Sequence, residues 1–247
     1  MGKQSYDEIG LLYAKHRRPD PRIAAAINRA LGPAASIVDC GAGTGSYEPA
    51  DRRVYAVEPS NVMIRQRSSN AAPAIRASAE SLPFRSESFD AALAVLTIHH
   101  WGDWVSGLRE MRRVARRVVV LTFDVAFIDT YWLTRDYIPA GAAFDRTRIP
   151  SMNVVADVLG ATRIERMAIP HDCVDGFLCA YWRRPQAYLD PEVRACISNL
   201  AMLDPLDVLP GIARLRSDVE SGRWQERYAD LLRRDELDCG YRLVVRE

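Results

Sequence analysis

The 247-residue sequence lacks the features that mark several large classes of protein. No apolar run reaches the length that a membrane helix needs, and the opening residues MGKQSYDEIG contain no apolar core of a secretory signal. The five cysteines are scattered and form no CxxC pair, so neither a disulfide framework nor a zinc site is expected. These absences favour a cytoplasmic protein whose thiols stay reduced.

An excess of charge of either sign is also absent. Lys and Arg total 33, Asp and Glu total 32, and the formal net charge is +1. A balanced chain has no general electrostatic attraction to nucleic acid or to an anionic membrane, so we expect neither as a partner. The chain has four histidines, and His171 with Asp175 is too isolated a group to suggest a metal, so no metal is expected.

Apolar strand patterns alternate with helical patterns over the first half of the chain. This alternation is typical of parallel β-α-β units, and it predicts an α/β fold with a doubly wound, mostly parallel sheet. The predicted strands are 36–39, 53–57, 74–76, 89–98 and 118–123, and the predicted helices are 21–31, 61–67 and 101–113.

The pattern changes after Asp124. Residues 125–150 are rich in aromatic residues without clear periodicity, and long segments of this kind inside a domain are usually functional. A helix at 151–159, a strand at 162–168, helices at 191–201, 211–220 and 223–232, and a strand at 240–247 are predicted to follow. We predict one domain, 1–247, with a core of about 20–124, 151–172 and 235–247 and a helical cap of about 1–19, 125–150 and 174–234.

A glycine-rich turn follows the first predicted strand in the sequence DCGAGTGS, residues 39–46. It differs from the dinucleotide fingerprint GxGxxG because Ser46 stands where the third glycine would be, and because Asp39 directly precedes the turn. Glycines let a ligand approach the backbone closely, and Glu58 at the end of the next strand is placed to accept hydrogen bonds from ribose hydroxyls. Together these residues predict a nucleoside ligand.

Further motifs occur in order after the turn. They are VDCGAGTG (38–45), AVEPSNVM (56–63), RASAESLPF (76–84), FDAALAVLTIHHW (89–101) and LREMRRVAR (108–116). With these motifs the sequence resembles the class I S-adenosylmethionine (SAM)-dependent methyltransferases, and most closely the small-molecule branch typified by ubiquinone and menaquinone biosynthesis methyltransferases. The resemblance implies a seven-stranded Rossmann-like sheet, SAM as cofactor and S-adenosylhomocysteine as product.

The resemblance also assigns the residues that hold the cofactor. It places the methionine part of SAM on Asp39, Gly41, Ala42, Gly43 and Gly45, the ribose on Glu58, the adenine beside Pro59, Ser60, Met63, Ala79 and Glu80, and the sulfonium beside Leu96 and Thr97. The helix after the glycine turn is expected to be one turn long, which reduces its dipole. Tyr13 or Arg18 is therefore a candidate donor for the SAM carboxylate, the alternative being that both are surface residues before a helix cap.

A sulfonium methyl is already activated, so the protein must mainly align the acceptor and exclude water. His99 and His100 lie where substrate should sit, and either is a candidate general base; otherwise one of them packs or caps the next helix. An aromatic substrate pocket is predicted from Trp101, Tyr131, Trp132, Tyr137, Tyr181 and Trp182, although each alone could be core.

Three functions remain open from the sequence. The first is a SAM-dependent methyltransferase that acts at O, N or C of a soluble small molecule, in bacterial specialised metabolism. The second keeps the fold and SAM but performs non-methylating chemistry such as cyclisation, because a fold does not fix a reaction. The third is a binding module, either an NAD-type protein or a scaffold without catalysis.

Overall fold

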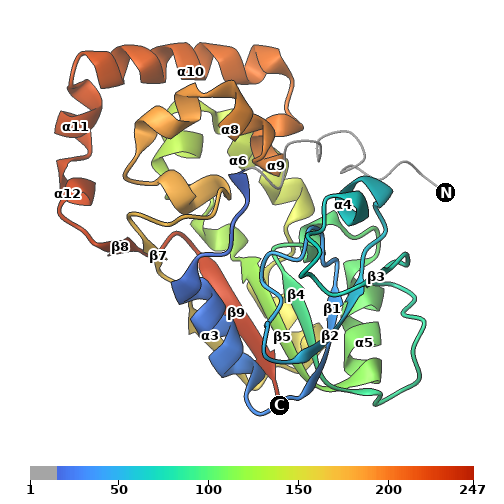
Figure 1. The fold of residues 1–247 in the computed structure, drawn as a ribbon. Helices are drawn as coiled ribbons and strands as arrows, with labels where there is room; N and C mark the ends of the chain where they lie inside the picture. The colour runs from blue at the N-terminus through green and yellow to red at the C-terminus, as the bar shows by residue number, and fades with distance from the viewer. Residues whose placement is uncertain (1–15) are drawn as a thin grey trace.

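A seven-stranded sheet runs through the computed structural model, which describes residues 16–247 (Figure 1). Neighbouring strands in the order β3-β2-β1-β4-β5 are parallel, whereas β9 pairs antiparallel with both β5 and β6. The strands are β1 (Ser36–Cys40), β2 (Arg53–Val57), β3 (Ala74–Ile75), β4 (Phe89–Val95), β5 (Ala115–Phe123), β6 (Arg163–Arg166) and β9 (Tyr241–Arg246). The prediction of a mostly parallel, seven-stranded sheet is confirmed.

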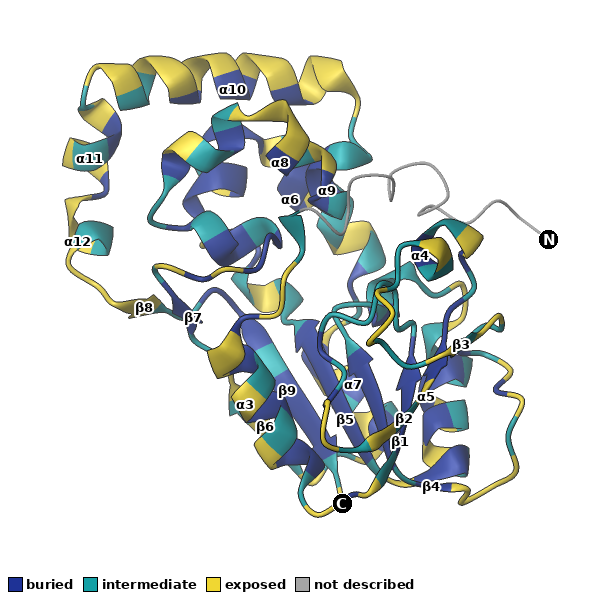
Figure 2. Ribbon diagram, viewed as in Figure 1, coloured by how far each residue is buried: buried dark blue, intermediate teal, exposed yellow. Residues whose placement is uncertain are grey.

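Side chains of the central strands alternate between two apolar layers. On β4, Ala91 and Leu93 belong to the cluster that contains the buried face of α3 (Pro21–Leu31). Their neighbours Ala92 and Ala94 belong to the cluster that contains α5 (Trp104–Val114) and α7 (Met152–Leu159). Because successive strand residues point to opposite faces, a continuous apolar run is what a strand covered on both sides requires (Figure 2).

Short polar residues begin the helices that flank the sheet. Asp20 accepts a hydrogen bond from the Arg22 N–H at the start of α3, and Ser60 accepts one from Met63 at the start of α4 (Asn61–Arg65). Asp103 does the same for α5. These caps satisfy backbone donors that have no partner inside the helix, so they fix where each helix begins.

Residues 125–150 and 174–234 gather beyond the ends of the central strands (Figure 1). Trp132 is buried among them, with ring centroids 5.2–5.8 Å from those of Tyr137, Tyr188, Trp224 and Tyr228. A small antiparallel sheet pairs β7 (Ile169–Pro170) with β8 (Glu236–Leu237). The helical elements are η3 (Val125–Phe127), η4 (Leu133–Tyr137), α6 (Pro139–Arg148), η5 (Leu178–Tyr181), η6 (Pro185–Leu189), α8 (Pro191–Ala195), α9 (Ser198–Ala201), α10 (Pro205–Glu220), α11 (Arg223–Arg227) and α12 (Ala229–Leu232).

Several predicted boundaries are wrong. β4 ends at Val95 because Leu96 adopts a positive φ of 52°, and the 3-10 helix η2 (Ile98–His100) follows. α5 starts only at Trp104, after its cap Asp103. β5 begins at Ala115, three residues before the strand start predicted at Val118.

Other predicted helices are broken or missing. The helix predicted for 191–201 is two short helices, α8 and α9, in which Val193, Cys196, Ile197 and Leu200 are buried and Ala201 is partly buried. The helix predicted for 223–232 is likewise α11 and α12. No helix follows the glycine turn, since residues 41–52 contain turns and irregular segments. The β7–β8 pair was not predicted.

No helix among residues 16–247 is long and apolar enough to cross a membrane, and this part of the chain contains no cluster of metal-ligating side chains.

Candidate active site

The glycine-rich turn between β1 and β2 is a tight backbone structure. Gly41, Gly43 and Gly45 have positive φ of 70°, 52° and 85°, where a side chain would be strained. A Cβ on Gly41 would lie 2.3 Å from Thr97 Oγ1, and one on Gly43 would lie 3.3 Å from Met63 Cε. The glycines are therefore required by the approach of neighbouring side chains as well as by backbone conformation.

Backbone donors of the turn are used within the protein. Gly41 N–H and Ala42 N–H donate to the Val57 carbonyl at 2.9 and 3.1 Å, and Gly43 N–H donates to Glu58 Oε2 at 2.8 Å. Glu58 Oε1 accepts a further bond from Ser60 N–H, so this buried carboxylate joins the turn to the start of α4. Since three donors of the turn already have partners, an anionic ligand group here needs a donor from elsewhere.

A hollow lies against the turn, and we call it the cradle. It is lined by Arg17, Asp39, Gly41, Ala42, Gly43, Thr44, Ser46, Tyr47 and Val95. Residues from the start of the described chain, the ends of β1 and β4, and the glycine turn therefore meet around one small space.

The cradle is electrostatically suited to a cation. Burial raises the pKa of Asp39 well above its ordinary range, and the nearby charges of Glu48 and Glu58 raise it further. Arg67 opposes this rise, but it is ion-paired with Glu48. The ionised form of Asp39 is therefore disfavoured in the empty cradle, and a positively charged ligand would favour it.

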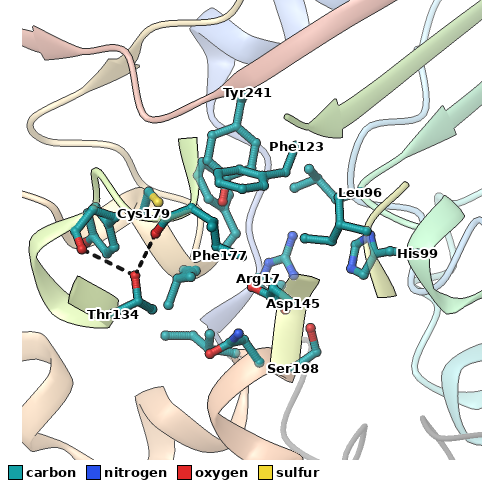
Figure 3. A pocket seen from close by; sticks show the side chains of 16 residues that line it. Arg17, Leu96, His99, Phe123, Thr134, Asp145, Phe177, Cys179, Ser198 and Tyr241 are labelled. Carbon is teal, nitrogen blue, oxygen red and sulfur yellow. Dashed lines mark hydrogen bonds between the residues drawn. The ribbon is translucent and has the colours of Figure 1, made fainter. Parts of the chain in front are cut away.

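A larger hollow, with a cavity volume of about 70 Å³, adjoins the cradle (Figure 3). Leu96, directly after the cradle residue Val95, lines it, and Arg17 lines both spaces. Its apolar wall is formed by Leu96, Phe123, Ile128, Tyr131, Ile149, Phe177, Leu178, Cys179, Ile197 and Tyr241. Its polar groups are Arg17, His99, Thr134, Asp145, Ser198 and Asn199.

Both predicted histidines lie at this junction, and their rings are 4.0 Å apart. His99 lines the larger hollow, and its buried Nδ1 has no hydrogen-bond partner in the described chain. His100 instead receives a bond from Arg148 at 3.1 Å through its Nδ1. Burial, together with Arg148 and Arg17, lowers the pKa of His99 to about 3 and that of His100 well below its ordinary value. Both imidazoles are therefore neutral at neutral pH.

Comparison with known proteins identifies the family to which this chain belongs. A family model described as a methyltransferase domain matches residues 38–123. A crystal structure of an Anabaena variabilis protein, assigned as a methyltransferase of an antibiotic biosynthesis pathway, is 35% identical and has a TM-score of 0.85. The similarity covers 94% of this chain and 99% of that protein. This chain belongs to the SAM-dependent methyltransferase family.

More distant structures share the fold alone. A SAM-dependent methyltransferase of Thermotoga maritima is 23% identical with a TM-score of 0.52, over 66% of this chain and 84% of that one. The [4+2]-cyclase SpnF is 18% identical with a TM-score of 0.52, over 98% of this chain and 93% of that one. No curated protein sequence matches the chain.

The cofactor of this methyltransferase is SAM, and the cradle fits it. The glycine turn lines the cradle with backbone that a ligand can approach closely, and the buried carboxyl of Asp39 suits the positive charge of SAM. Of the residues assigned to its methionine part, Asp39, Gly41, Ala42 and Gly43 line the cradle, whereas Gly45 faces a separate surface groove.

The predicted ribose and adenine residues lie beside the cradle, outside its lining. Ser60, Met63 and Ala79 are buried, and Met63 contacts the glycine turn. Pro59 is partly buried next to Glu58. Glu80 accepts bonds from the N–H groups of Gly102 and Asp103, which secures the segment before α5. Thr97 packs on Gly41.

The donor predicted for the SAM carboxylate is displaced by one residue. Arg18 is exposed and lines neither space, whereas Arg17 lines both and is ion-paired with the fully buried Asp175 at 2.7 Å. Tyr13 lies outside the described residues. Nothing in the sequence distinguishes Arg17 from Arg18, because the choice depends on Asp175, 158 positions away.

Most of the predicted pocket aromatics pack elsewhere. Tyr131 lines the larger hollow. Trp101 packs on Gly107 of α5, and Trp132, Tyr137, Tyr181 and Trp182 pack within the helical region without lining the hollow. Aromatic residues missed by the sequence prediction, Phe123, Phe177 and Tyr241, line it instead. The signal for Phe123 and Tyr241 was their position at strand ends facing this region.

Proposed function

We propose that this methyltransferase moves a methyl group from SAM to a small molecule bound in the larger hollow. The observation that carries the proposal is the contact between the two spaces at the end of β4. Val95 lines the cradle, and the next residue, Leu96, lines the larger hollow, so the two spaces lie on either side of one peptide bond. In open α/β sheets, ligands bind at this carboxyl edge of the strands.

When bound, SAM supplies an activated methyl group, and the chain's residues hold and shield the reactants. Glu58 accepts from the ribose hydroxyls, as the family resemblance implies, and its bonds from Gly43 and Ser60 hold the carboxylate in place. Arg17 supplies the cation for the SAM carboxylate, and its pair with Asp175 fixes its direction.

His99 is the proposed contact to the acceptor. Its neutral imidazole has an unpartnered Nδ1, which can accept a hydrogen bond and orient an acceptor atom. With a pKa of about 3 it is a weak base, so alignment rather than proton removal is its main contribution. His100, held by Arg148, supports the ring of His99.

We further propose that residues 125–150 and 174–234 act as a cap over the reaction. They supply Ile128, Asp145, Phe177 and Ile197, so one side of the larger hollow belongs to this region. Exclusion of water prevents competing reactions at an activated methyl. Because the cap carries the least regular sequence, it is also where substrate choice would reside.

Two finer assignments are included in the proposal. The 35% sequence identity to an Anabaena variabilis protein assigned to antibiotic biosynthesis supports a role in bacterial specialised metabolism. The motifs 38–45 and 89–101 support the small-molecule branch that includes ubiquinone and menaquinone biosynthesis methyltransferases. A cytoplasmic location stays a prediction.

The test is formation of S-adenosylhomocysteine in the presence of candidate acceptors. Methyl transfer requires one S-adenosylhomocysteine for each methylated product. Turnover of an acceptor without S-adenosylhomocysteine would favour the non-methylating alternative, since the cyclase SpnF shares this fold. SAM bound without turnover of any acceptor would favour a binding module.

A further inference from the structure

In the larger hollow, a group of aromatic side chains lies across from a polar side formed by Asp145 and Ser198, while Arg17, His99 and Thr134 line other parts of it (Figure 3). Phe123 and Tyr241 lie on one side with ring centroids 5.4 Å apart, and Phe177 lies 4.8 Å from Tyr241. Asp145 of α6 and Ser198 of α9 lie across from them. A ligand that fills the hollow therefore needs an apolar body and a polar group at one end.

Asp145 is the charged group of that polar side that lacks a counter-ion. It is hydrogen-bonded by the Asn199 side chain, and no Arg or His among residues 16–247 lies within ion-pair distance of it. Arg17 is paired with Asp175. Arg148, one turn further along α6, donates toward His100 Nδ1 and the His99 carbonyl.

The ionisation of Asp145 is consistent with this environment. Burial raises its pKa to about 6, while Asn199 and Arg148 oppose the rise. Its carboxylate is therefore mostly ionised at neutral pH, and it would gain from a cation in the hollow.

A second acceptor lies beside it. Asn199 is 5% exposed, and its Nδ2 donates to the Gly141 carbonyl at 2.9 Å. Its Oδ1 is buried without a hydrogen-bond partner in the described chain. An unpartnered buried acceptor is costly, so a donor from a ligand would stabilise it.

We propose that the larger hollow recognises a protonated amine carried on an apolar or aromatic body. The ammonium donates to the Asp145 carboxylate and to Asn199 Oδ1, and the body packs against Phe123, Phe177 and Tyr241. An ammonium group offers three donors and a positive charge, whereas a hydroxyl offers one donor and no charge. Aromatic faces also attract a cation, while a ligand carboxylate would be repelled by Asp145.

This inference rests on the proposed function, because it names the substrate class of the same site. The experiment uses the full chain saturated with S-adenosylhomocysteine and titrates it in a calorimeter with 2-phenylethylamine, 2-phenylethanol and phenylacetate. Larger naphthyl analogues of the three probes extend the series. We expect the amine to bind at least about tenfold more tightly than the matched alcohol, and the carboxylate more weakly than either.

The Asp145→Asn variant should lose the preference for the amine, and Asp157→Asn on the exposed side of α7 should keep it. Gly141→Ala is an independent test, because its Cβ would lie 2.8 Å from Asn199 Oδ1 and disturb that acceptor. It should weaken amine binding several-fold while leaving S-adenosylhomocysteine binding unchanged. Thermal unfolding checks that each variant is folded.

Equal affinity for amine and alcohol, an unchanged preference in Asp145→Asn, or failure of every amine to bind would overturn the inference. Binding of S-adenosylhomocysteine, measured first, separates the two claims. If S-adenosylhomocysteine binds and the amine preference is absent, the inference alone fails. If S-adenosylhomocysteine does not bind, the proposed function fails, and the inference with it.

Discussion

At the scale of single residues, Glu58 gives the most direct test of the proposed cofactor site. Its two carboxylate oxygens each accept a backbone hydrogen bond 2.8 Å long, from Gly43 and from Ser60. Removing the carboxylate strands both donors and removes the proposed ribose contact. We expect Glu58→Ala to weaken S-adenosylhomocysteine binding by about 1–3 kcal/mol, measured by calorimetry.

The control for this change is Glu165→Ala on β6, whose carboxylate pairs with Arg163 at the surface. It should leave affinity unchanged. Wild-type affinity in Glu58→Ala would remove Glu58 from the cofactor site.

His99 predicts a pH dependence of stability. Its folded pKa of about 3 lies below the ordinary value of 6.5, so the folded state binds the proton more weakly than the unfolded state. The stability associated with the neutral ring is fully present above about pH 6.5 and is lost as pH falls toward 3. Between pH 7 and pH 5 we expect about 2 kcal/mol of loss from this histidine.

Urea unfolding of wild type and His99→Gln at pH 8, 7 and 5 measures this effect. The variant should lose less stability between pH 7 and pH 5 than wild type, and the values at pH 8 give the cost of the substitution itself. Identical losses in the two proteins would show that His99 is not held neutral by burial.

At the scale of elements, local sequence patterns were sufficient to predict several helices and strands of the central sheet layer. The helix at 21–31 and the strand at 53–57 were predicted with their observed bounds, because an N-cap and an apolar run are local signals. The end of β4 could not be predicted, since Leu96 adopts its positive φ where its N–H donates to the Leu121 carbonyl on the next strand.

The helices of residues 125–150 and 174–234 were predicted poorly for a related reason. These helices are short and are held by contacts between distant segments, such as Trp132 with Trp224. The periodic pattern across 191–201 predicted a single helix and missed the break at Cys196 and Ile197. For the site, the glycine turn was predictable from its motif, whereas the choice of Arg17 over Arg18 required the folded chain.

The packing of the Trp101 ring against α5 gives a prediction at this scale. A Cβ on Gly107 would lie 2.4 Å from Trp101 Cε3, whereas one on Gly102 would have nothing nearer than Glu80 Oε1 at 3.8 Å. Overpacking typically costs about 1–3 kcal/mol, which exceeds the gain of about 1 kcal/mol that alanine brings to a helix. We expect Gly107→Ala to lower the free energy of urea unfolding and Gly102→Ala to leave it nearly unchanged. A stabilised Gly107→Ala protein would place Trp101 away from α5.

At the scale of the whole molecule, one buried polar network joins three distant parts of the chain. Asp175, fully buried between the small sheet and η5, accepts from Arg17 Nε at 2.7 Å and from Tyr47 Oη at 2.8 Å. Arg17 and Tyr47 both line the cradle, so the cofactor site depends on the helical region for its shape.

Breaking this network should therefore cost more than breaking a surface pair. We expect Asp175→Asn to lower the free energy of unfolding by about 3–5 kcal/mol, because Arg17 and Tyr47 lose the buried carboxylate to which both donate. The matched control is Asp230→Asn, whose partner Arg233 is also exposed and whose loss should cost less than about 1 kcal/mol. Similar small losses in both variants would mean that the network does not hold the parts together.

The measurement that tests the central claim most directly is a calorimetric titration of the purified protein with SAM and with S-adenosylhomocysteine, with NAD as the comparison. The account predicts saturable one-to-one binding of both SAM species and weaker binding of both in Arg17→Gln, with no binding of NAD. Binding of NAD in place of SAM, or wild-type affinity in Arg17→Gln, would contradict the cofactor site as assigned.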